Sequence, residues 1–304
     1  MKTGAMPVGH LTAEQVRSVL RAATTPPPLA GGRPWRFHCT PETIELYADP
    51  VPVAWDTGTE HRDQLLDCGA ALLNLRLAIR AQGCYPDARL LPDASRPELL
   101  AVVRPHGRDP AAPVDRRLAD AVQLRRSNRR PFTPATVVPS VQRELRRAAE
   151  IERAWLATVS PAQQPQLREI MRRAWPDAPA TPGSEALLSD LDVEPDRLIV
   201  VIGSLHDAPL SRLQAGQALQ RVLLTATAAG LSAAFLPQVV TPMTLRRELR
   251  QLLGGGLWPQ IMLRLGHGTP VPQEARARLE DVVTSDERPF RASRLDPVPR
   301  RAPR

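Results

Sequence analysis

The order of apolar and polar residues divides this chain into helices and short strands. Helices are predicted where apolar side chains recur every three or four residues. These segments are 12–25, 59–82, 114–124, 141–150, one beginning at 160, 210–229 and 242–253. Strands are predicted where apolar residues alternate with polar ones or run together. These are 36–39, 43–48, 88–91, 99–103, 155–159, 197–203, a strand ending at 236, and 259–265. The mixture predicts an α+β fold.

Several helix ends carry recognisable signals. Thr12 and Gln15 form a capping box, in which a hydroxyl and an amide satisfy the first free backbone groups. Gly83 is a predicted stop for the long helix before it. Ser160 followed by Pro161, and Thr241 followed by Pro242, predict two further helix starts.

Two segments of the chain resemble each other. Cys68-Gly69-Ala70-Ala71-Leu72 is followed by Gly83, and Ala215-Gly216-Gln217-Ala218-Leu219 is followed by Gly230 at the same interval. Each long helix then leads to a short apolar strand that ends in Leu-Pro. Two Ala/Leu helices could agree by chance, but the glycine interval and the Leu-Pro endings agree together. The pattern favours a duplication, which would give two stacked lobes with pseudo-twofold symmetry.

The duplication divides the chain into two predicted halves and a tail. The N-terminal half covers residues 1–110, and the C-terminal half covers 111–285. A Pro/Ala/Gly-rich loop or lid is predicted near 176–190 inside the second half. The Pro/Arg-rich tail at 286–304 has no core of its own.

Composition and charge exclude several kinds of chemistry. A hydrophobic content of 42% is sufficient for a core, and the net charge is +8. Lys2 is the sole lysine, so the chain contains no phosphate-loop lysine, pyridoxal Schiff base or lysine nucleophile beyond it. Because Arg, Ala, Pro and Gly use G+C-rich codons, part of the basicity reflects the genome. The charge therefore favours anionic ligands without predicting a nucleic-acid partner.

The cysteines, the histidines and the apolar runs indicate in which compartment the protein works and whether it binds a metal or spans a membrane. Three cysteines without a Cys-x-x-Cys pair predict a reducing compartment, the cytoplasm. The start of the chain lacks a signal-peptide pattern. The longest apolar run, 222–236, is broken by Gly230 and is too short for a comfortable membrane span. The six histidines show no metal-ligand spacing, so no metal site is predicted.

The clearest candidate for ligand chemistry is the stretch Leu124 to Phe132. Four arginines and one serine crowd the end of an amphipathic run, which Pro131 stops. Guanidinium groups are planar, permanently charged donors, and a neighbouring hydroxyl adds another, which suits a phosphate dianion. A solvated basic helix end is the alternative interpretation.

The order Arg-Arg-Ser-x-Arg-x-x-Phe resembles the phosphate-binding signature of the nitroreductase superfamily. With the duplication, it resembles the Acg-like branch, in which one chain carries two fused copies of the fold. The resemblance runs from about Thr12 to Val283 and is strongest over 214–238 and 259–266. It implies a nitroreductase-like α+β fold of two fused half-domains with pseudo-twofold symmetry, and FMN as cofactor. It also implies hydride transfer involving NAD(P)H or an organic substrate, with a small molecule as acceptor.

The resemblance also implies which residues hold the flavin. Arg125, Arg126, Ser127 and Arg129 would bind its phosphate, together with a second basic pair, Arg276 and Arg278. Leu236, Pro237 and Gln238 would lie along the flavin ring. No side chain is required as acid or base, so no catalytic residue is predicted. One chain would be sufficient to form the site, and the sequence leaves open whether the protein forms a homodimer.

The N-terminal flavin motif departs from the family pattern. Relatives read Pro-Ser-x-x-Asn-x-Gln-Pro-Trp, whereas this chain has Pro28, Gly31 and Arg33 at the three polar positions. The Pro-Trp-Arg-Phe sequence that follows is retained, which predicts an intact turn and hairpin. Gly31 leaves room beside the ring, and Arg33 could donate to a flavin carbonyl or to a substrate carboxylate.

Two other functions remain open from the sequence. A flavin-binding protein with little turnover, acting in sequestration or regulation, is also compatible with an Acg-like resemblance. An Arg-rich nucleic-acid binder is the weaker alternative, because no groove-reading motif is visible.

Overall fold

The computed structural model describes residues 6–29, 34–49, 59–128, 130, 132–133, 135–174, 198–236, 240–269 and 283–284. The described helices are α1 (Ala13–Ala23), α2 (Thr59–Ala81), α3 (Pro113–Leu124), α4 (Pro139–Ile151), η2 (Pro161–Gln163), α5 (Gln164–Ala174), α7 (Pro209–Ala228) and α8 (Met243–Leu252). The described strands are β1 (Trp35–Cys39), β2 (Ile44–Ala48), β3 (Tyr85–Leu90), β4 (Leu99–His106), β5 (Trp155–Thr158), β6 (Leu198–Ser204), β7 (Ser232–Phe235), β8 (Trp258–Gly266) and β9 (Val283–Thr284). The predicted α+β class is confirmed, and each predicted element is present within a few residues of its expected bounds.

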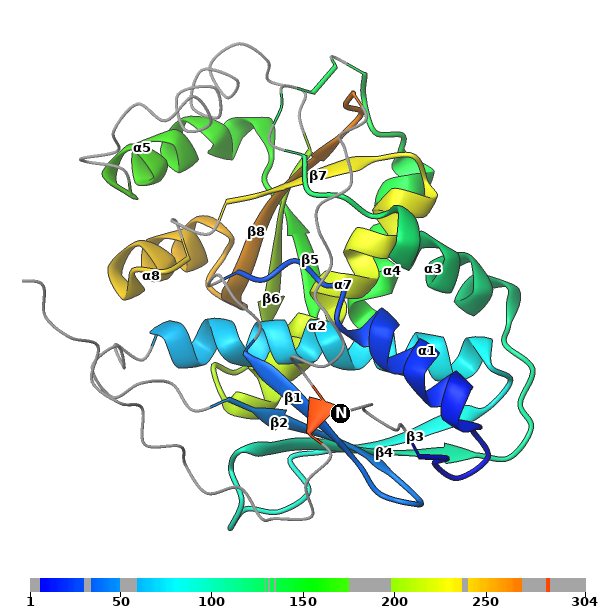
Figure 1. The fold of residues 1–304 in the computed structure, drawn as a ribbon. Helices are drawn as coiled ribbons and strands as arrows, with labels where there is room; N and C mark the ends of the chain where they lie inside the picture. The colour runs from blue at the N-terminus through cyan, green and yellow to red at the C-terminus, as the bar shows by residue number, and fades with distance from the viewer. Residues whose placement is uncertain are drawn as a thin grey trace, which may run out of the picture.

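The described strands form two sheets with matching topology (Figure 1). One has the order β3-β4-β2-β1-β9 and the other has the order β5-β6-β8-β7. Read from the opposite end, the second sheet is β7-β8-β6-β5, which matches β3-β4-β2-β1 strand for strand. All neighbouring pairs in both sets of four are antiparallel. The two halves therefore repeat one arrangement.

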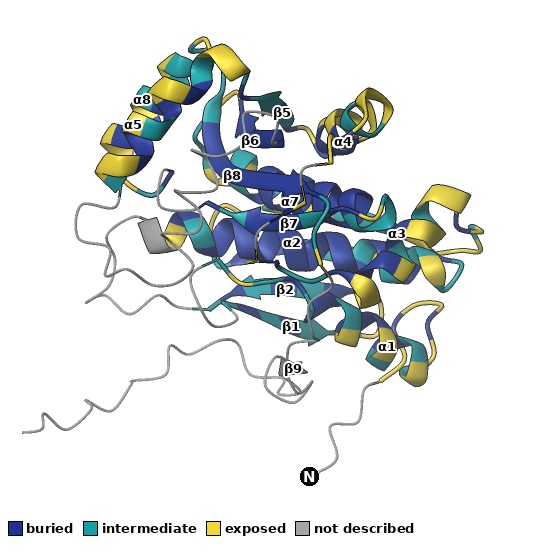
Figure 2. Cartoon of the chain, turned by 90° about the horizontal axis from the view of Figure 1, so that it is seen from above, coloured by how far each residue is buried: buried dark blue, intermediate teal, exposed yellow. Residues whose placement is uncertain are grey.

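Helices α2 and α7 form the centre of the molecule and lie between the two sheets (Figure 2). They pack at their matching glycines. A Cβ atom built on Gly69 would lie 2.2 Å from the Leu213 carbonyl oxygen, and one built on Gly216 would lie 2.1 Å from the Leu66 carbonyl oxygen. The contact is thus reciprocal, as a two-fold axis requires. No side chain larger than hydrogen fits at either position.

The glycines that follow these helices are equivalent as well. Gly83 and Gly230 have φ angles of +78° and +75°, which is the left-handed region that glycine enters without a steric penalty. Both end their helix and turn the chain into an edge strand. The predicted glycine stop at Gly83 is confirmed.

The two sheets differ in how their outer faces are covered. In the C-terminal sheet, alternate residues of β6 face opposite sides, with Val200 and Ile202 toward α7 and Ile199 and Val201 toward the α5–α8 pair. Every residue of β6 is consequently buried, as its continuous apolar sequence predicts. In the N-terminal sheet β2 alternates between buried and half-buried residues, which is typical of a sheet packed on one face.

The last described strand crosses from one half to the other. β9 pairs in parallel with β1, with Val283 beside Phe37. The segment predicted to end the C-terminal half thus completes the N-terminal sheet. One helix start differs from expectation: Pro242, not Thr241, is the N-cap of α8, and no side chain caps it.

Candidate functional site

The arginine-rich stretch begins where α3 ends. Arg125 is the C-cap residue, and its backbone N–H donates to the Ala121 carbonyl. Its side chain folds back to a buried position, and Nη1 donates to Ser127 Oγ at 3.3 Å. The Arg125 guanidinium and the Ser127 hydroxyl thus lie side by side on the loop, as the sequence predicts.

The loop is fixed against the C-terminal sheet by Asn128. Its backbone N–H donates to the Ala233 carbonyl at 2.9 Å, and its Nδ2 donates to the Thr269 carbonyl at 3.1 Å. A Cβ atom on Gly268 would lie 2.6 Å from Asn128 Nδ2, so only glycine allows this approach. Ser127 also forms an isolated bridge with Ala233. The donor groups are therefore held on an anchored segment.

A further arginine lies beneath the loop. Arg264 of β8 is 1% exposed, and its guanidinium carbon lies 4.3 Å from the centre of the Phe132 ring. Its Nη2 donates to the Arg130 carbonyl at 3.4 Å. Sequence reasoning missed this residue, although a charged residue within the apolar run 261–265 was an available signal. Its charge adds to the positive potential of the loop.

Arg126 has a different environment from Arg125. Its Nη1 donates to the carbonyls of Gln123 at 2.8 Å and Arg125 at 2.7 Å, which are acceptors at the C-terminal end of α3. A cation is favourable there because of the helix dipole. The observed contacts of Arg126 are therefore those of a helix end, and its predicted role toward phosphate stays a prediction.

Of the other predicted ligand residues, the structure describes only Leu236. Leu236 is fully buried, and its N–H donates to the Met262 carbonyl at 2.9 Å, so its side chain belongs to the core beneath α5 and α8. The remaining predicted ligands lie outside the described residues: Gly31, Arg33, Arg129, Pro237, Gln238, Arg276 and Arg278.

A second buried arginine cluster lies at the start of α2. Arg62 donates to the Asp63 carboxylate and to the Gln260 carbonyl, and burial lowers its pKa to about 10. Nearby, Asp207 accepts from Arg246 and from Arg212 Nε at 3.0 Å. Burial opposes ionisation of Asp207, but these donors outweigh it and bring its pKa to about 2. The cluster joins α2 to the C-terminal half.

Comparison with known proteins shows relatives over nearly the whole chain. "Putative NAD(P)H nitroreductase Rv3131" of Mycobacterium tuberculosis is 28% identical over 89% of this chain and 91% of the relative. "Putative NAD(P)H nitroreductase acg" of the same organism is 25% identical over 91% of this chain and 97% of the relative. These relatives confirm the resemblance to the Acg-like members of the nitroreductase superfamily. No protein-family model matches it.

Solved structures align with part of this chain. The nitroreductase-like family protein from Bacillus cereus is 18% identical, with a TM-score of 0.44, and covers 56% of this chain and 96% of its own. The NfrA1 nitroreductase from B. subtilis is 14% identical, with a TM-score of 0.42, and covers 55% of this chain and 73% of its own. The assignment rests on the sequence relatives and not on these alignments.

Two further findings concern the described part of the chain. None of its helices combines the length and apolar character needed to cross a membrane. No group of three or more His, Cys, Asp or Glu residues is arranged there to hold a metal ion.

Proposed function

We propose that this protein is an FMN-dependent oxidoreductase of the nitroreductase type. It would transfer hydride between NAD(P)H or an organic substrate and a second small-molecule acceptor. The observation that carries the proposal is the buried Arg125 guanidinium beside the Ser127 hydroxyl on an anchored loop. The nitroreductase names of relatives that span nearly the whole chain support it.

The residues of the loop fit the phosphate end of FMN. A phosphate dianion accepts hydrogen bonds and carries charge, and Arg125 with Ser127 offers charged and neutral donors side by side. Arg264 adds positive charge from beneath, which further favours an anion. Arg129, Arg276 and Arg278 are proposed to complete the phosphate site.

The protein's own part in the reaction is binding and orientation. Bound FMN supplies hydride acceptance and donation, so no side chain of the chain need act as acid or base. Asn128 would hold the loop, and with it the phosphate, in one position relative to the C-terminal sheet. Pro237 and Gln238 are proposed to line the ring, as the resemblance to the nitroreductase superfamily implies.

The architecture supports a proposal on how the chain builds this site. The matching strand orders and the reciprocal Gly69–Gly216 contact support a tandem duplication with halves near 1–110 and 111–285. One chain would then supply both sides of the site without a second copy. The free thiols at Cys39, Cys68 and Cys84 are consistent with the proposed cytoplasmic location.

An absorbance spectrum tests the cofactor, and a turnover assay tests the activity. The protein purified in the presence of FMN should retain flavin absorbance after desalting and should oxidise NADPH under air. Arg125→Ala should lose the flavin, whereas Arg89→Ala, at an exposed arginine of β3, should keep it. Flavin retention without turnover would favour the sequestering alternative. No flavin binding by the wild-type chain would contradict both.

A further inference from the structure

The matching sheets differ at one edge. In the N-terminal sheet, the outer edge of β1 is paired with β9. The equivalent strand of the C-terminal sheet is β5, and among the described strands it pairs with β6 alone. Figure 2 shows β5 at the margin of the molecule, between α4 and the α5–α8 pair. Among the described strands, the repeat thus has an occupied edge in one half and an unpaired edge in the other.

The pairing register identifies the free backbone groups. Val159 N–H donates to the Ile199 carbonyl at 3.0 Å, so residues 155, 157 and 159 direct their backbone groups toward β6. Alternation in an antiparallel pair then directs the N–H and C=O of Leu156 and Thr158 outward. Unpaired groups of this kind are a template for an added strand. Two outward residues match the length of the β1–β9 pairing.

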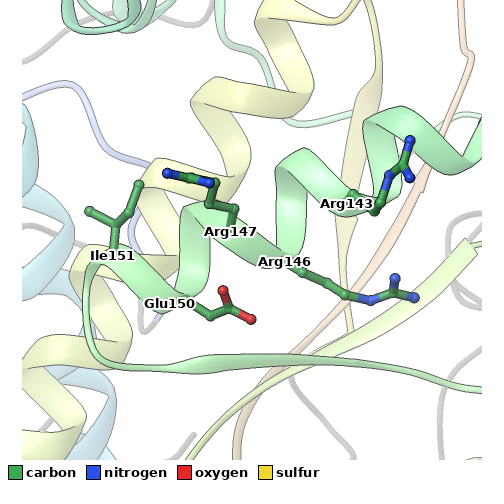
Figure 3. Close-up of a pocket in the computed structure, with 5 residues that line it drawn as sticks. All are labelled: Arg143, Arg146, Arg147, Glu150 and Ile151. Atoms are coloured by element: carbon green, nitrogen blue, oxygen red, sulfur yellow. The ribbon is translucent and has the colours of Figure 1, made fainter.

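A basic surface flanks this edge. Arg143, Arg146, Arg147, Glu150 and Ile151 of α4 line an open hollow of about 590 Å³ (Figure 3). Figure 3 shows the side chains of Arg143 and Arg146 projecting from neighbouring turns of this helix. Arg146 Nη2 donates to Thr158 Oγ1 at 3.4 Å, which places the hollow next to the open strand. Three arginines and one glutamate line the hollow, so its net charge is positive.

We propose that the β5 edge and the α4 arginines together form a docking site for an extended acidic segment of a partner protein. The segment would add as a strand to Leu156 and Thr158, and its carboxylates would pair with Arg143, Arg146 and Arg147. Backbone hydrogen bonds supply affinity in such strand addition, and flanking side chains supply selectivity.

Charge and proline content disfavour two other occupants of the β5 edge, a second copy of the chain and its own C-terminal tail. Two copies joined at their β5 edges would bring the same arginines together, which is unfavourable. The chain's own tail at 286–304 contains more arginines than acids and several prolines, which cannot donate to a ladder. An acidic partner satisfies both the open backbone and the charge.

The probe is a fluorescent, N-acetylated peptide of alternating Val and Glu, titrated onto the full chain and followed by anisotropy. The triple variant Arg143→Gln/Arg146→Gln/Arg147→Gln should bind it about tenfold more weakly, or worse. The matched control Arg89→Gln/Arg247→Gln removes exposed arginines of β3 and α8 and should bind as wild type. A Val/Lys peptide should not bind.

A second pair of variants tests the strand itself. Thr158→Pro removes an outward N–H at an edge position that tolerates proline, and should weaken binding by a similar factor. Thr158→Val keeps that N–H and should not. Hydrogen exchange at Leu156 and Thr158 should slow only when the peptide is present. Equal binding by Thr158→Pro would reduce the site to a loose electrostatic contact and overturn the proposal. Slow exchange in the free chain would show an edge already occupied, which overturns it equally.

Discussion

Arg62 and Arg125 show how neighbouring residues decide what a buried arginine does. Arg62 lies at the start of α2 and donates to Asp63, with Asp207 near enough to raise its pKa against the effect of burial. Arg125 lies at the end of α3 beside a hydroxyl, on a loop held by Asn128. The charge of Arg62 is therefore balanced by carboxylates of the protein itself. The pairing of Arg125 with a hydroxyl suits the binding of an anionic ligand.

At the residue scale, the proposed phosphate site predicts that replacing its arginines greatly weakens FMN binding. Each charge-assisted contact is worth roughly 1.5–3 kcal/mol, so Arg125→Ala/Arg129→Ala should weaken FMN binding on the order of a hundredfold or more. Fluorescence titration measures the affinity, and circular dichroism checks the fold. Arg117→Ala/Arg172→Ala, which removes two exposed arginines in surface ion pairs, is the matched control. Unchanged FMN affinity in the first variant would move the phosphate site elsewhere.

Arg33 stands where this chain departs from the N-terminal flavin motif of the family that it resembles. Gly31 and Arg33 replace side-chain amides whose neutral hydrogen bonds are worth about 0.5–1.5 kcal/mol each. FMN should still bind through its phosphate, and Arg33 should contribute its charge at the flavin or substrate pocket. We expect Arg33→Gln to shift the flavin reduction potential or the substrate KM, whereas Arg33→Lys should retain most of the effect. A crystal structure with the Arg33 guanidinium in bulk solvent would refute this role.

At the scale of elements, the α2–α7 contact holds the two halves together. Hydrogen bonds surround the glycine crossing: Gln220 Nε2 donates to Asn74 Oδ1 at 2.9 Å, and Arg76 Nη1 donates to Gln217 Oε1 at 2.6 Å. Glu152 accepts from Arg76 and from Arg221, so the turn before β5 joins the same network. Close backbone packing and buried polar pairs thus specify one arrangement of the helices.

The crossing predicts a strong steric effect. Gly69→Ala would place a methyl group 2.2 Å from the Leu213 carbonyl, so the helices must separate, at a cost of about 1–3 kcal/mol or more. Urea unfolding measures the loss. Gly256→Ala is the control, because nothing lies within 4 Å of that position. In the Gly69→Ala background, Gly216→Ala should lower the free energy of unfolding by less than it does in the wild-type chain, because the helices have already moved apart. A neutral Gly69→Ala would show that the helices do not pack this closely.

At the scale of the whole molecule, the proposed duplication raises the question of how many flavins one chain would hold. The Arg-Arg-Ser signature occurs once in the sequence. In the N-terminal half, Arg62 at the start of α2 is buried and donates to Asp63 and to the Gln260 carbonyl. Among the described residues, Arg62 is thus held by protein groups and does not repeat the arrangement of Arg125 and Ser127.

We accordingly expect one FMN per chain and a site complete in the monomer. Flavin absorbance against protein concentration gives the ratio, and analytical ultracentrifugation of the loaded protein gives its mass. The flavin should stay bound when the sample is diluted to monomer. A ratio of two, or flavin release that follows dissociation of a dimer, would contradict the expectation.

The sequence by itself determined the elements and their repeat. Periodicity, capping residues and glycine stops act within a few residues, so they can be read locally; Thr12 with Gln15 and the turn at Gly83 are examples. The Leu124–Phe132 stretch was likewise recognisable as a donor cluster, because its residues adjoin along the chain. The fold class and part of the candidate site were thus predictable.

Only the tertiary structure decided which distant residues meet. Gly69 and Gly216 pack reciprocally, β9 joins the sheet of the other half, and Arg264 lies beneath Phe132. These contacts join residues far apart in the chain, and no local pattern reports them. The edge of β5, which pairs with β6 alone among the described strands, was hidden for the same reason, because strand pairing joins residues that are far apart in the chain.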